Sequence, residues 1–230
     1  MGNGGKNYSA NLYLKESGVS MGKILCFIYE EMVDFEMTLA CHLLNREIIC
    51  IAYEKQVIKS KSGIWYYPMA TVKDALDYTD VEALIIPGGF NDEQRSELTE
   101  LIQNLNNKGT LLAAICAGTQ YLARAGVLQG RMYTTVLTKE KLREVFPMAL
   151  DDPFPRENYI NKNVVKDQNI ITALGNAFVD FAVEILDYFK LFKEEKDKQD
   201  MSNHYKCIIN FSPSVNALKD NSSDIAKLES

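Results

Sequence analysis

Residues 110–125 read TLLAAICAGTQYLARA, and this stretch contains the transition that decides the fold. Its apolar run, residues 111–115, is typical of a buried strand in a parallel sheet. The run passes without a loop into Cys116, Ala117 and Gly118, and then into a helical pattern. A strand that turns directly into a helix forces its central residue into strained backbone geometry and presents the side chain. The stretch therefore predicts a nucleophile elbow, with the cysteine at the carboxyl edge of the sheet.

A cysteine at this turn is suited to nucleophilic chemistry. Backbone N–H groups and the dipole of the following helix favour the thiolate, which is the reactive form. The alternative is a buried cysteine that acts as a small hydrophobic residue, which is common for this residue type. Because strand, turn and helix signals coincide at Cys116, we favour the nucleophile.

Strand and helix patterns alternate along the rest of the chain, which favours an α/β fold with a mostly parallel sheet and helices on both faces. Residues 56–72 resemble a hairpin beside this sheet, with SKSG as its turn, and residues 146–163 are expected to form a surface loop. The remaining strands are expected at residues 23–29, 47–53, 83–87, 127–135 and in two arms within 164–174, and the remaining helices at residues 36–45, 92–107, 139–145 and 177–192.

A single domain accounts for most of the 230 residues. We expect it to span residues 22–192, preceded by residues 1–21 as a flexible extension or leader. Residues 193–230 become highly charged and then polar, which predicts a mobile or loosely docked tail. The alternative is that the stretch CIINF, which begins at Cys207, adds a strand.

Composition and charge exclude several classes of function. The net charge of −6 and the sequence pI of about 5.1 argue against binding to nucleic acids or to anionic membranes. No apolar segment approaches the roughly 20 residues that span a bilayer, and none near Met1 resembles a secretory signal, so the expected location is the cytoplasm.

The five cysteines are odd in number and lack CxxC spacing, which argues against a disulfide framework or a structural zinc site. Cys26 and Cys50 lie in apolar, strand-like runs and are expected to fill the core. We therefore expect no metal ion and no cofactor.

A glycine pair is expected beside Cys116, because ligand sites in open α/β sheets gather at the carboxyl ends of the strands. Gly88 and Gly89 directly follow the strand at residues 83–87. Their backbone N–H groups, together with that of Ala117, are candidates for an oxyanion hole. The alternative is an ordinary glycine-rich turn.

The loop after the first strand contains four carboxylates, Glu30, Glu31, Asp34 and Glu36. A carboxylate at the start of a helix is often only a cap or a dipole partner. Glu36 differs because it opens an otherwise apolar helix, and it is therefore expected to face the site. Burial would raise its pKa, and a protonated Glu36 would donate a hydrogen bond to Cys116 and bring the pKa of the thiol close to neutral.

Neither of the two histidines is an evident base for this site. His42 lies six positions after Glu36, which places the two residues on different faces of one helix. His204 lies in the expected tail and would reach Cys116 only through an unusual fold-back or from a second subunit.

With these residues in view, the chain resembles the ThiJ/PfpI family, the superfamily of the parkinsonism-associated protein deglycase with a class I glutamine amidotransferase-like fold. The resemblance covers residues 23–192 and rests on EEMVDFE, LIIPGGF, AAICAGTQYLARAGVLQGRMYTT and VVKDQNIITALGNAFVDFAVEIL. It implies a flavodoxin-like three-layer α/β/α sandwich that forms a homodimer. It also implies a reactive Cys116, a protonated Glu36, and backbone donors at Gly89 and Ala117.

Departures from the family pattern narrow the function. Ala117 follows the cysteine, whereas proteases and glyoxalases of the family usually carry a histidine there or elsewhere in the pocket. The late part of the domain lacks the His and Glu pair of the amidotransferases. An intracellular cysteine peptidase and a glutaminase are therefore disfavoured. We expect an enzyme of the glyoxalase or deglycase type, a hydrolase or lyase that acts on small reactive carbonyls or on modified proteins. The alternative is a redox-sensing or stress-response protein in which Cys116 is oxidised to a sulfinate.

Overall fold

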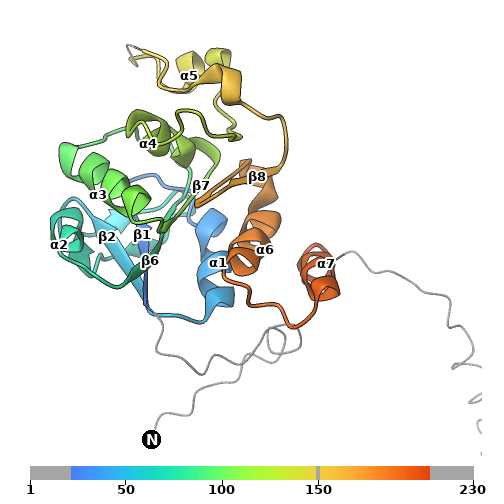
Figure 1. Cartoon of the computed structure of the whole chain (residues 1–230). Coiled ribbons are helices and arrows are strands. Elements are labelled where there is room, and N and C mark those ends of the chain that lie inside the picture. Colours follow the sequence, from blue (N-terminus) through green and yellow to red (C-terminus); the bar gives the residue numbers. More distant parts are fainter. Residues whose placement is uncertain (1–21, 149–150, 208–230) are drawn as a thin grey trace, which may run out of the picture.

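A seven-stranded sheet forms the centre of the computed structural model, which describes residues 22–148 and 151–207 (Figure 1). The strand order is β5-β2-β1-β6-β7-β9-β8; β8 runs antiparallel to β9, and the other neighbouring pairs are parallel. The strands are β1 (Lys23–Phe27), β2 (Ile48–Ala52), β5 (Ala70–Thr71), β6 (Val81–Ile86), β7 (Leu111–Ile115), β8 (Val164–Asp167) and β9 (Ile170–Ala173).

Helices cover both faces of the sheet, which confirms the predicted α/β sandwich (Figure 1). One face is covered by α1 (Phe35–Leu44) and α6 (Phe178–Tyr188), which pack against each other. The other face is covered by α2 (Val72–Leu76), α3 (Ser96–Asn107) and α4 (Thr119–Arg124), and α5 (Lys139–Val145) lies beyond α4. Within the described ranges, no helix has the length and apolar character that crossing a membrane requires.

The central strands are apolar along their length because helices shield both faces of the sheet. Every residue of β7 is buried, and in β1 every residue after Lys23 is buried. This burial explains the uninterrupted apolar run at residues 111–115. Cys116 is partly exposed and is the first residue beyond the covered part of the sheet.

The predicted hairpin is present beside the sheet. Its arms, β3 (Ile58–Lys59) and β4 (Trp65–Tyr66), pair antiparallel. The two arms predicted within residues 164–174 are β8 and β9.

The predicted strand at residues 127–135 is wrong. Gly126 and Gly130 adopt positive φ angles of 77° and 68°, and the segment forms turns with one isolated bridge from Tyr133 to Tyr159. The physical reason lies in the sheet: both edges of β7 are already paired, with β6 and β9, so the segment that follows α4 has no free edge to join there.

Part of the segment expected to form a tail is helical, and the domain boundary at residue 192 stays a prediction. Helix α7 (Glu195–Tyr205) packs on α6 (Figure 1), where a mobile or loosely docked tail was expected. Met201 is fully buried, and the Lys198 ammonium pairs with Glu184 at 2.7 Å and with Asp187 at 2.9 Å. Burial of Met201, packing of the partly buried Tyr205 and ion pairs to α6 therefore dock a helix whose sequence is mostly charged. The expected leader at residues 1–21 and the alternative strand after Cys207 lie outside the described residues.

Candidate active site

The chain turns sharply at Cys116, between β7 and α4. Cys116 has a φ of 59°, in the left-handed region that residues with a side chain rarely adopt. Gly118 permits the turn, because a Cβ there would collide with the Pro87 and Ile86 carbonyl oxygens at the end of β6. Thr119 then donates its hydroxyl to the Cys116 carbonyl at 2.9 Å. The backbone has the predicted elbow geometry, and the reactivity of the thiol remains a prediction.

Glu36 lies against this elbow, inside the first turn of α1. Its side chain is buried, at 3% exposure, and its Oε2 accepts a hydrogen bond of 2.8 Å from the Gly88 N–H. A Cβ built on Gly88 would lie 2.5 Å from the Glu36 Oε2 and 2.9 Å from the Cys116 Sγ. The Glu36 carboxylate and the Cys116 sulfur therefore both lie against the Gly88 backbone, where only glycine, which has no side chain, leaves room for them.

The structure separates the roles of the other three carboxylates in the loop. Glu30 and Glu31 are exposed; Glu30 accepts the Lys59 N–H, and Glu31 pairs with a lysine. Asp34 is buried and accepts hydrogen bonds from hydroxyl groups of the hairpin, from Ser60, Ser62 and Tyr66. Burial favours a higher pKa for Asp34, but these hydrogen bonds outweigh it and lower the pKa. Asp34 thus fastens the hairpin to the loop, and Glu36 alone of the four carboxylates enters the site.

Glu36 and Cys116 strongly affect each other's ionisation. Burial raises the pKa of Glu36, although hydrogen bonds from Gly88 and from the thiol oppose this shift. Burial and the adjacent Glu36 carboxylate raise the pKa of Cys116 to about 12, although the Ala117 N–H favours the thiolate. Both shifts favour the neutral form of each group, so the site opposes a negative charge on both groups at once.

Two expectations about this pair have different outcomes. The predicted direction for the pKa of Glu36 is confirmed. The predicted lowering of the pKa of Cys116 toward neutral is wrong, because burial and a neighbouring negative charge both oppose a second negative charge on sulfur. That Glu36 is protonated in the resting site, as the resemblance implies, stays a prediction.

The three expected oxyanion donors occupy different positions. Gly88 directs its N–H at Glu36, so it would reach a substrate oxygen only after this bond is released. Gly89 forms an antiparallel bridge with Met32, in the loop before α1. The Ala117 N–H faces the sulfur of Cys116, at the start of the turn. An oxyanion hole formed by these groups stays a prediction, and Ala117 is the best placed of the three.

Both histidines lie at the surface of the described structure. His42 is exposed on α1, and His204 is exposed on α7, which packs on α6. Among the residues that the structure describes, no group of three or more His, Cys, Asp or Glu side chains is arranged to hold a metal ion.

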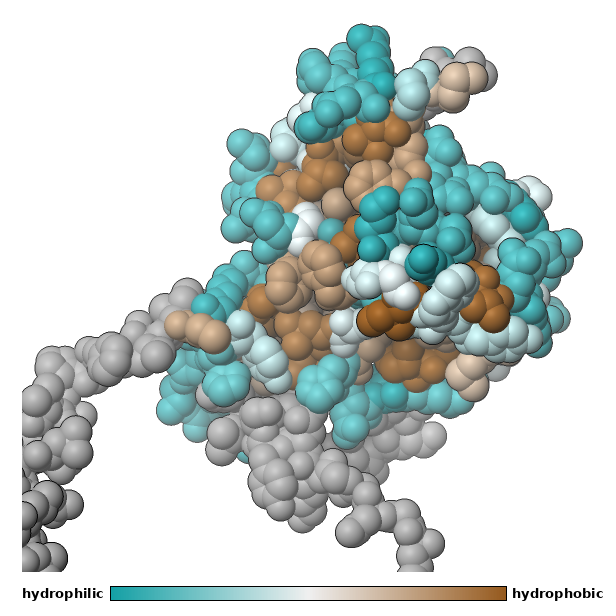
Figure 2. Space-filling model, turned by 180° about the vertical axis from the view of Figure 1, so that it is seen from behind, coloured by the Kyte–Doolittle hydropathy of each residue, from teal (hydrophilic) through white to brown (hydrophobic). Residues whose placement is uncertain are grey.

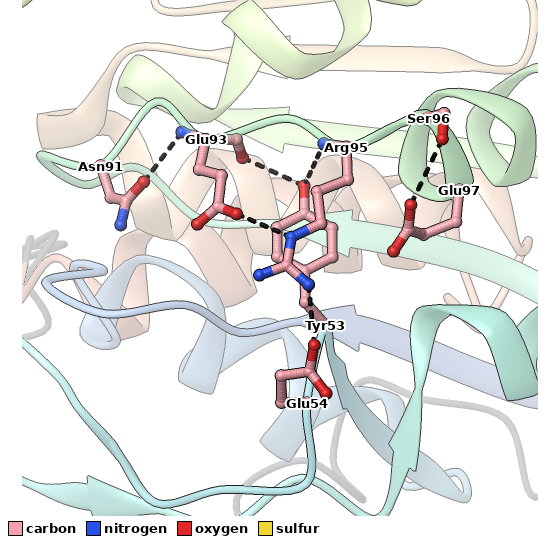
Figure 3. Close-up of polar contacts among 7 residues, drawn as sticks. All are labelled: Tyr53, Glu54, Asn91, Glu93, Arg95, Ser96 and Glu97. Carbon is pink, nitrogen blue, oxygen red and sulfur yellow. Dashed lines mark hydrogen bonds and ion pairs between the residues drawn. The ribbon is translucent and has the colours of Figure 1, made fainter.

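The loop that follows the glycine pair is anchored at the end of β2 (Figure 3). Tyr53 accepts a hydrogen bond of 3.0 Å from the Arg95 N–H and donates one of 3.0 Å to the Glu93 carbonyl. The Arg95 guanidinium lies 4.5 Å from the centroid of the Tyr53 ring and pairs with Glu93 and Glu54. A cavity of about 90 Å³ adjoins this network, and Cys116 does not line it. The network therefore holds the loop but does not belong to the reacting centre.

Gly175 is a site residue that the sequence analysis missed. It follows β9, and a Cβ built on it would lie 2.6 Å from the Glu36 Oε1 and 3.1 Å from the Cys116 Sγ. Gly88, after β6, and Gly175, after β9, thus both lie against Glu36 and Cys116. The signal in the sequence was a glycine directly after a strand next to β7, which is the same pattern as Gly88 after β6.

Gly175→Ala is expected to lower kcat for the carbonyl substrates proposed below by roughly 10²-fold, because the new methyl group displaces the Glu36 carboxylate by a distance that matters for catalysis. The measurement is steady-state kinetics, with circular dichroism to check the fold. Gly130→Ala is the matched control: its Cβ meets open space, and its positive φ strains the backbone without touching the site. Unchanged kinetics in Gly175→Ala would contradict the assigned packing.

Comparisons with known proteins identify the family of the chain. The DJ-1/PfpI family matches residues 22–188. The deglycase PfpI of Pyrococcus furiosus is 31% identical over 121 residues, covering 50% of this chain and 72% of its own. The glutathione-independent glyoxalase DJR-1.2 of Caenorhabditis elegans is 28% identical over 166 residues, covering 69% of this chain and 83% of its own.

A solved structure supports the same assignment. The thiJ/pfpI family protein from Bacillus anthracis superposes with a TM-score of 0.70 at 25% identity, covering 84% of this chain and 94% of that protein. The family match spans the sheet, the elbow at Cys116 and the helix that carries Glu36. The chain therefore belongs to the DJ-1/PfpI family.

Proposed function

We propose that the protein is an enzyme that converts small reactive carbonyl compounds, 2-oxoaldehydes such as methylglyoxal or their adducts with proteins, through Cys116 and Glu36. The observation that carries this proposal is the buried Glu36 carboxylate held against the thiol at the elbow. Relatives described as a deglycase and as a glutathione-independent glyoxalase support the same class of substrate.

The first step needs a base, and Glu36 is in place to act as one. The Cys116 sulfur attacks the aldehyde carbon as the S–H proton passes to the Glu36 carboxylate. Glu36 then gives this proton to the former aldehyde oxygen, which yields a hemithioacetal and restores the carboxylate. The raised pKa of the Cys116 thiol is consistent with a mechanism in which the proton leaves while the S–C bond forms. We assign the stabilisation of the developing charge on oxygen to the Ala117 N–H.

The second stage moves a proton along the substrate. The Glu36 carboxylate removes the proton from the former aldehyde carbon as the neighbouring ketone oxygen takes up a proton from water, which gives an enediol. Glu36 then returns its proton to the neighbouring carbon, and the hydroxyl on the former aldehyde carbon loses its proton to water as the thioester carbonyl forms. The product is a thioester of a 2-hydroxy acid. Water hydrolyses this thioester, which releases the acid and restores the thiol. The net reaction adds one water to the 2-oxoaldehyde and needs no oxidant or reductant.

The raised pKa of Cys116 also favours an enzyme over a sensor at this residue. Oxidation by peroxide proceeds through the thiolate, and burial and Glu36 oppose the thiolate. A nucleophile that loses its proton during attack does not require a resting thiolate.

The proposal is tested by incubating the purified chain with methylglyoxal, phenylglyoxal and a protein that carries methylglyoxal adducts. We expect the 2-hydroxy acid, detected by chiral chromatography, or the release of the adduct, detected by mass spectrometry. A lack of turnover on the whole panel would refute an enzyme of this class.

We further propose that the protein forms a homodimer through the hairpin. Hydrophobic side chains reach the surface between hydrophilic ones (Figure 2), and large ones concentrate on and around β3 and β4. These side chains are Val57, Ile64, Trp65, Tyr67 and Met69, each at least 54% exposed. A concentration of this kind is typical of a protein interface.

Trp65→Glu is expected to convert the dimer to a monomer, because it places a charge where an apolar side chain would be buried. Sedimentation velocity over a range of protein concentrations measures the change. Met132→Glu, at a side chain of 50% exposure outside the hairpin, is the control and should remain dimeric. A wild-type chain that sediments as a monomer, or a dimer unaffected by Trp65→Glu, would exclude this interface.

A further inference from the structure

We propose that Cys26 and Cys41 are a reversible dithiol–disulfide pair, a redox modification site separate from Cys116. Their Sγ atoms lie 3.4 Å apart, one on β1 and the other on α1. A disulfide bond is about 2.05 Å long, so the two sulfur atoms need to approach by about 1.4 Å. The strand and the helix that packs on it already hold the two sulfur atoms face to face.

The surroundings of the two thiols give them complementary roles. Cys41 is partly exposed, whereas Cys26 is fully buried. A hydrogen bond from Cys26 lowers the pKa of Cys41 despite the opposing effect of burial, and the same bond, together with burial, raises the pKa of Cys26. Cys41 is therefore the more acidic and the more exposed of the two thiols, and we assign it the first reaction with the oxidant and assign Cys26 the resolution of the oxidised product.

A third cysteine, Cys50, lies near the pair but is less reactive than Cys41. Cys50 lies opposite Cys26 in the pairing of β1 with β2, so both side chains belong to the same face of the sheet. Burial, followed by the charge of Cys41, raises the pKa of Cys50 to about 11. Cys50 is therefore a poor nucleophile, and it serves as an internal control for chemistry at Cys41.

The oxidation balances with a hydroperoxide as the oxidant. The Cys41 thiolate attacks the hydroperoxide, an S–O bond forms as the O–O bond breaks, and the leaving oxygen takes up a proton as water or an alcohol. Cys26 then attacks the sulfenic acid at the Cys41 sulfur; the S–S bond forms, the S–O bond breaks, and the Cys26 proton leaves with the oxygen as water. Two thiols and one hydroperoxide thus give a disulfide, water and the reduced peroxide. A dithiol such as dithiothreitol reverses the reaction by exchange.

The location of the pair gives its oxidation a consequence, which rests on the proposed function. Glu36 lies five residues before Cys41 on the same helix, and its carboxylate depends on a hydrogen bond of 2.8 Å to Gly88. Drawing the middle of α1 toward β1 shifts the position of this carboxylate. We expect the disulfide form to turn over carbonyl substrates several-fold more slowly, and reduction to restore the rate.

The cross-link can be tested without any activity assay. The full chain is treated with a small molar excess of hydrogen peroxide, and remaining thiols are blocked with N-ethylmaleimide. An unreduced digest with a protease that cuts after glutamate, which separates Cys26 from Cys41, is examined by mass spectrometry. We expect a peptide pair joined through Cys26 and Cys41, lighter by two hydrogens and lost on reduction. The pair should be absent from Cys41→Ser and Cys26→Ala, and present in the matched variants Cys50→Ser and Cys116→Ser.

Three results would contradict the proposed disulfide. A Cys41 that remains labelled by maleimide, that accumulates as a sulfinate beside a free Cys26, or that joins Cys50 would overturn the proposal. Because Cys41 is partly exposed, Cys41→Ser decides the matter even if Cys26→Ala does not fold. If the untreated chain shows no turnover, the proposed function fails, and the cross-linked peptide still decides this inference.

Discussion

Cys116→Ser is expected to lower turnover of methylglyoxal by roughly 10³-fold or more, with the fold unchanged. A serine hydroxyl at this turn is a far weaker nucleophile than a thiol, and Glu36 is too weak a base to remove its proton at neutral pH. Steady-state kinetics gives the loss. Mass spectrometry after rapid quenching should detect a substrate adduct at Cys116 in the wild-type chain and none in the variant.

Cys207→Ser is a matched control for this substitution. Cys207 is exposed and also has a positive φ, of 54°, so the same exchange is made in a similar backbone conformation at a position outside the site. We expect wild-type kinetics from it. Substantial turnover by the Cys116→Ser variant would rule out the covalent mechanism, whatever the activity of the wild-type chain.

Glu36→Gln is expected to lower kcat by about 10²-fold to 10⁴-fold, the usual range for loss of a general base. Glutamine preserves the shape of the side chain, and its oxygen can still accept the Gly88 N–H. It cannot accept the thiol proton. Glu31→Gln, in the same loop but at an exposed side chain that pairs with Lys61, is the control and should retain full activity.

The same variant should make the Cys116 thiol more acidic while it lowers turnover. The Glu36 carboxylate helps to raise the pKa of Cys116, so its removal favours the thiolate. The rate of alkylation by iodoacetamide as a function of pH measures this shift. If Glu36 instead acts only by stabilising the thiolate, Glu36→Gln will slow both alkylation and turnover. That result would contradict the proposal that Glu36 is a base.

Glu36 also predicts how stability depends on pH. Because burial raises its pKa, the folded chain binds this proton more tightly than the unfolded chain, whose value is about 4.3. The contribution of Glu36 to stability is therefore fully present below the unfolded pKa and is lost as pH rises through the folded pKa. Relative to Glu36→Gln, the wild-type chain should lose stability over this interval in urea titrations. A difference that is constant with pH would contradict the shifted pKa.

Local sequence patterns predicted the elbow and its surroundings because each signal lies within a few residues. The apolar run at residues 111–115, the glycine after Cys116 and the following helical period specify a strand, a turn and a helix in order. Glu36 was separable from its three acidic neighbours for a similar reason, since it opens an apolar helix. The structure shows that Glu36 is buried in the site, that Glu30 and Glu31 are exposed, and that Asp34 is buried against the hairpin, which the sequence pattern did not predict.

Other features depend on contacts between distant segments, and local patterns did not predict them. Helix α7 has a charged sequence, and it docks because Met201 is buried and Lys198 meets acidic residues of α6. The expected strand at residues 127–135 fails because β6 and β9 already occupy both edges of β7. Neither fact can be read from the segment concerned, because each depends on which partners the rest of the fold leaves free.

The sequence by itself determined the α/β fold, the turn at Cys116 and the carboxylate that accompanies it, because these features follow from apolar periodicity and from small residues at fixed positions. Only the tertiary structure decided the ionisation of the pair, the approach of Gly175 and the meeting of Cys26 with Cys41. The physical reason is that desolvation, charge and sulfur–sulfur contact act through space over a few ångströms. Residues far apart in the chain come that close only when the sheet and its helices assemble.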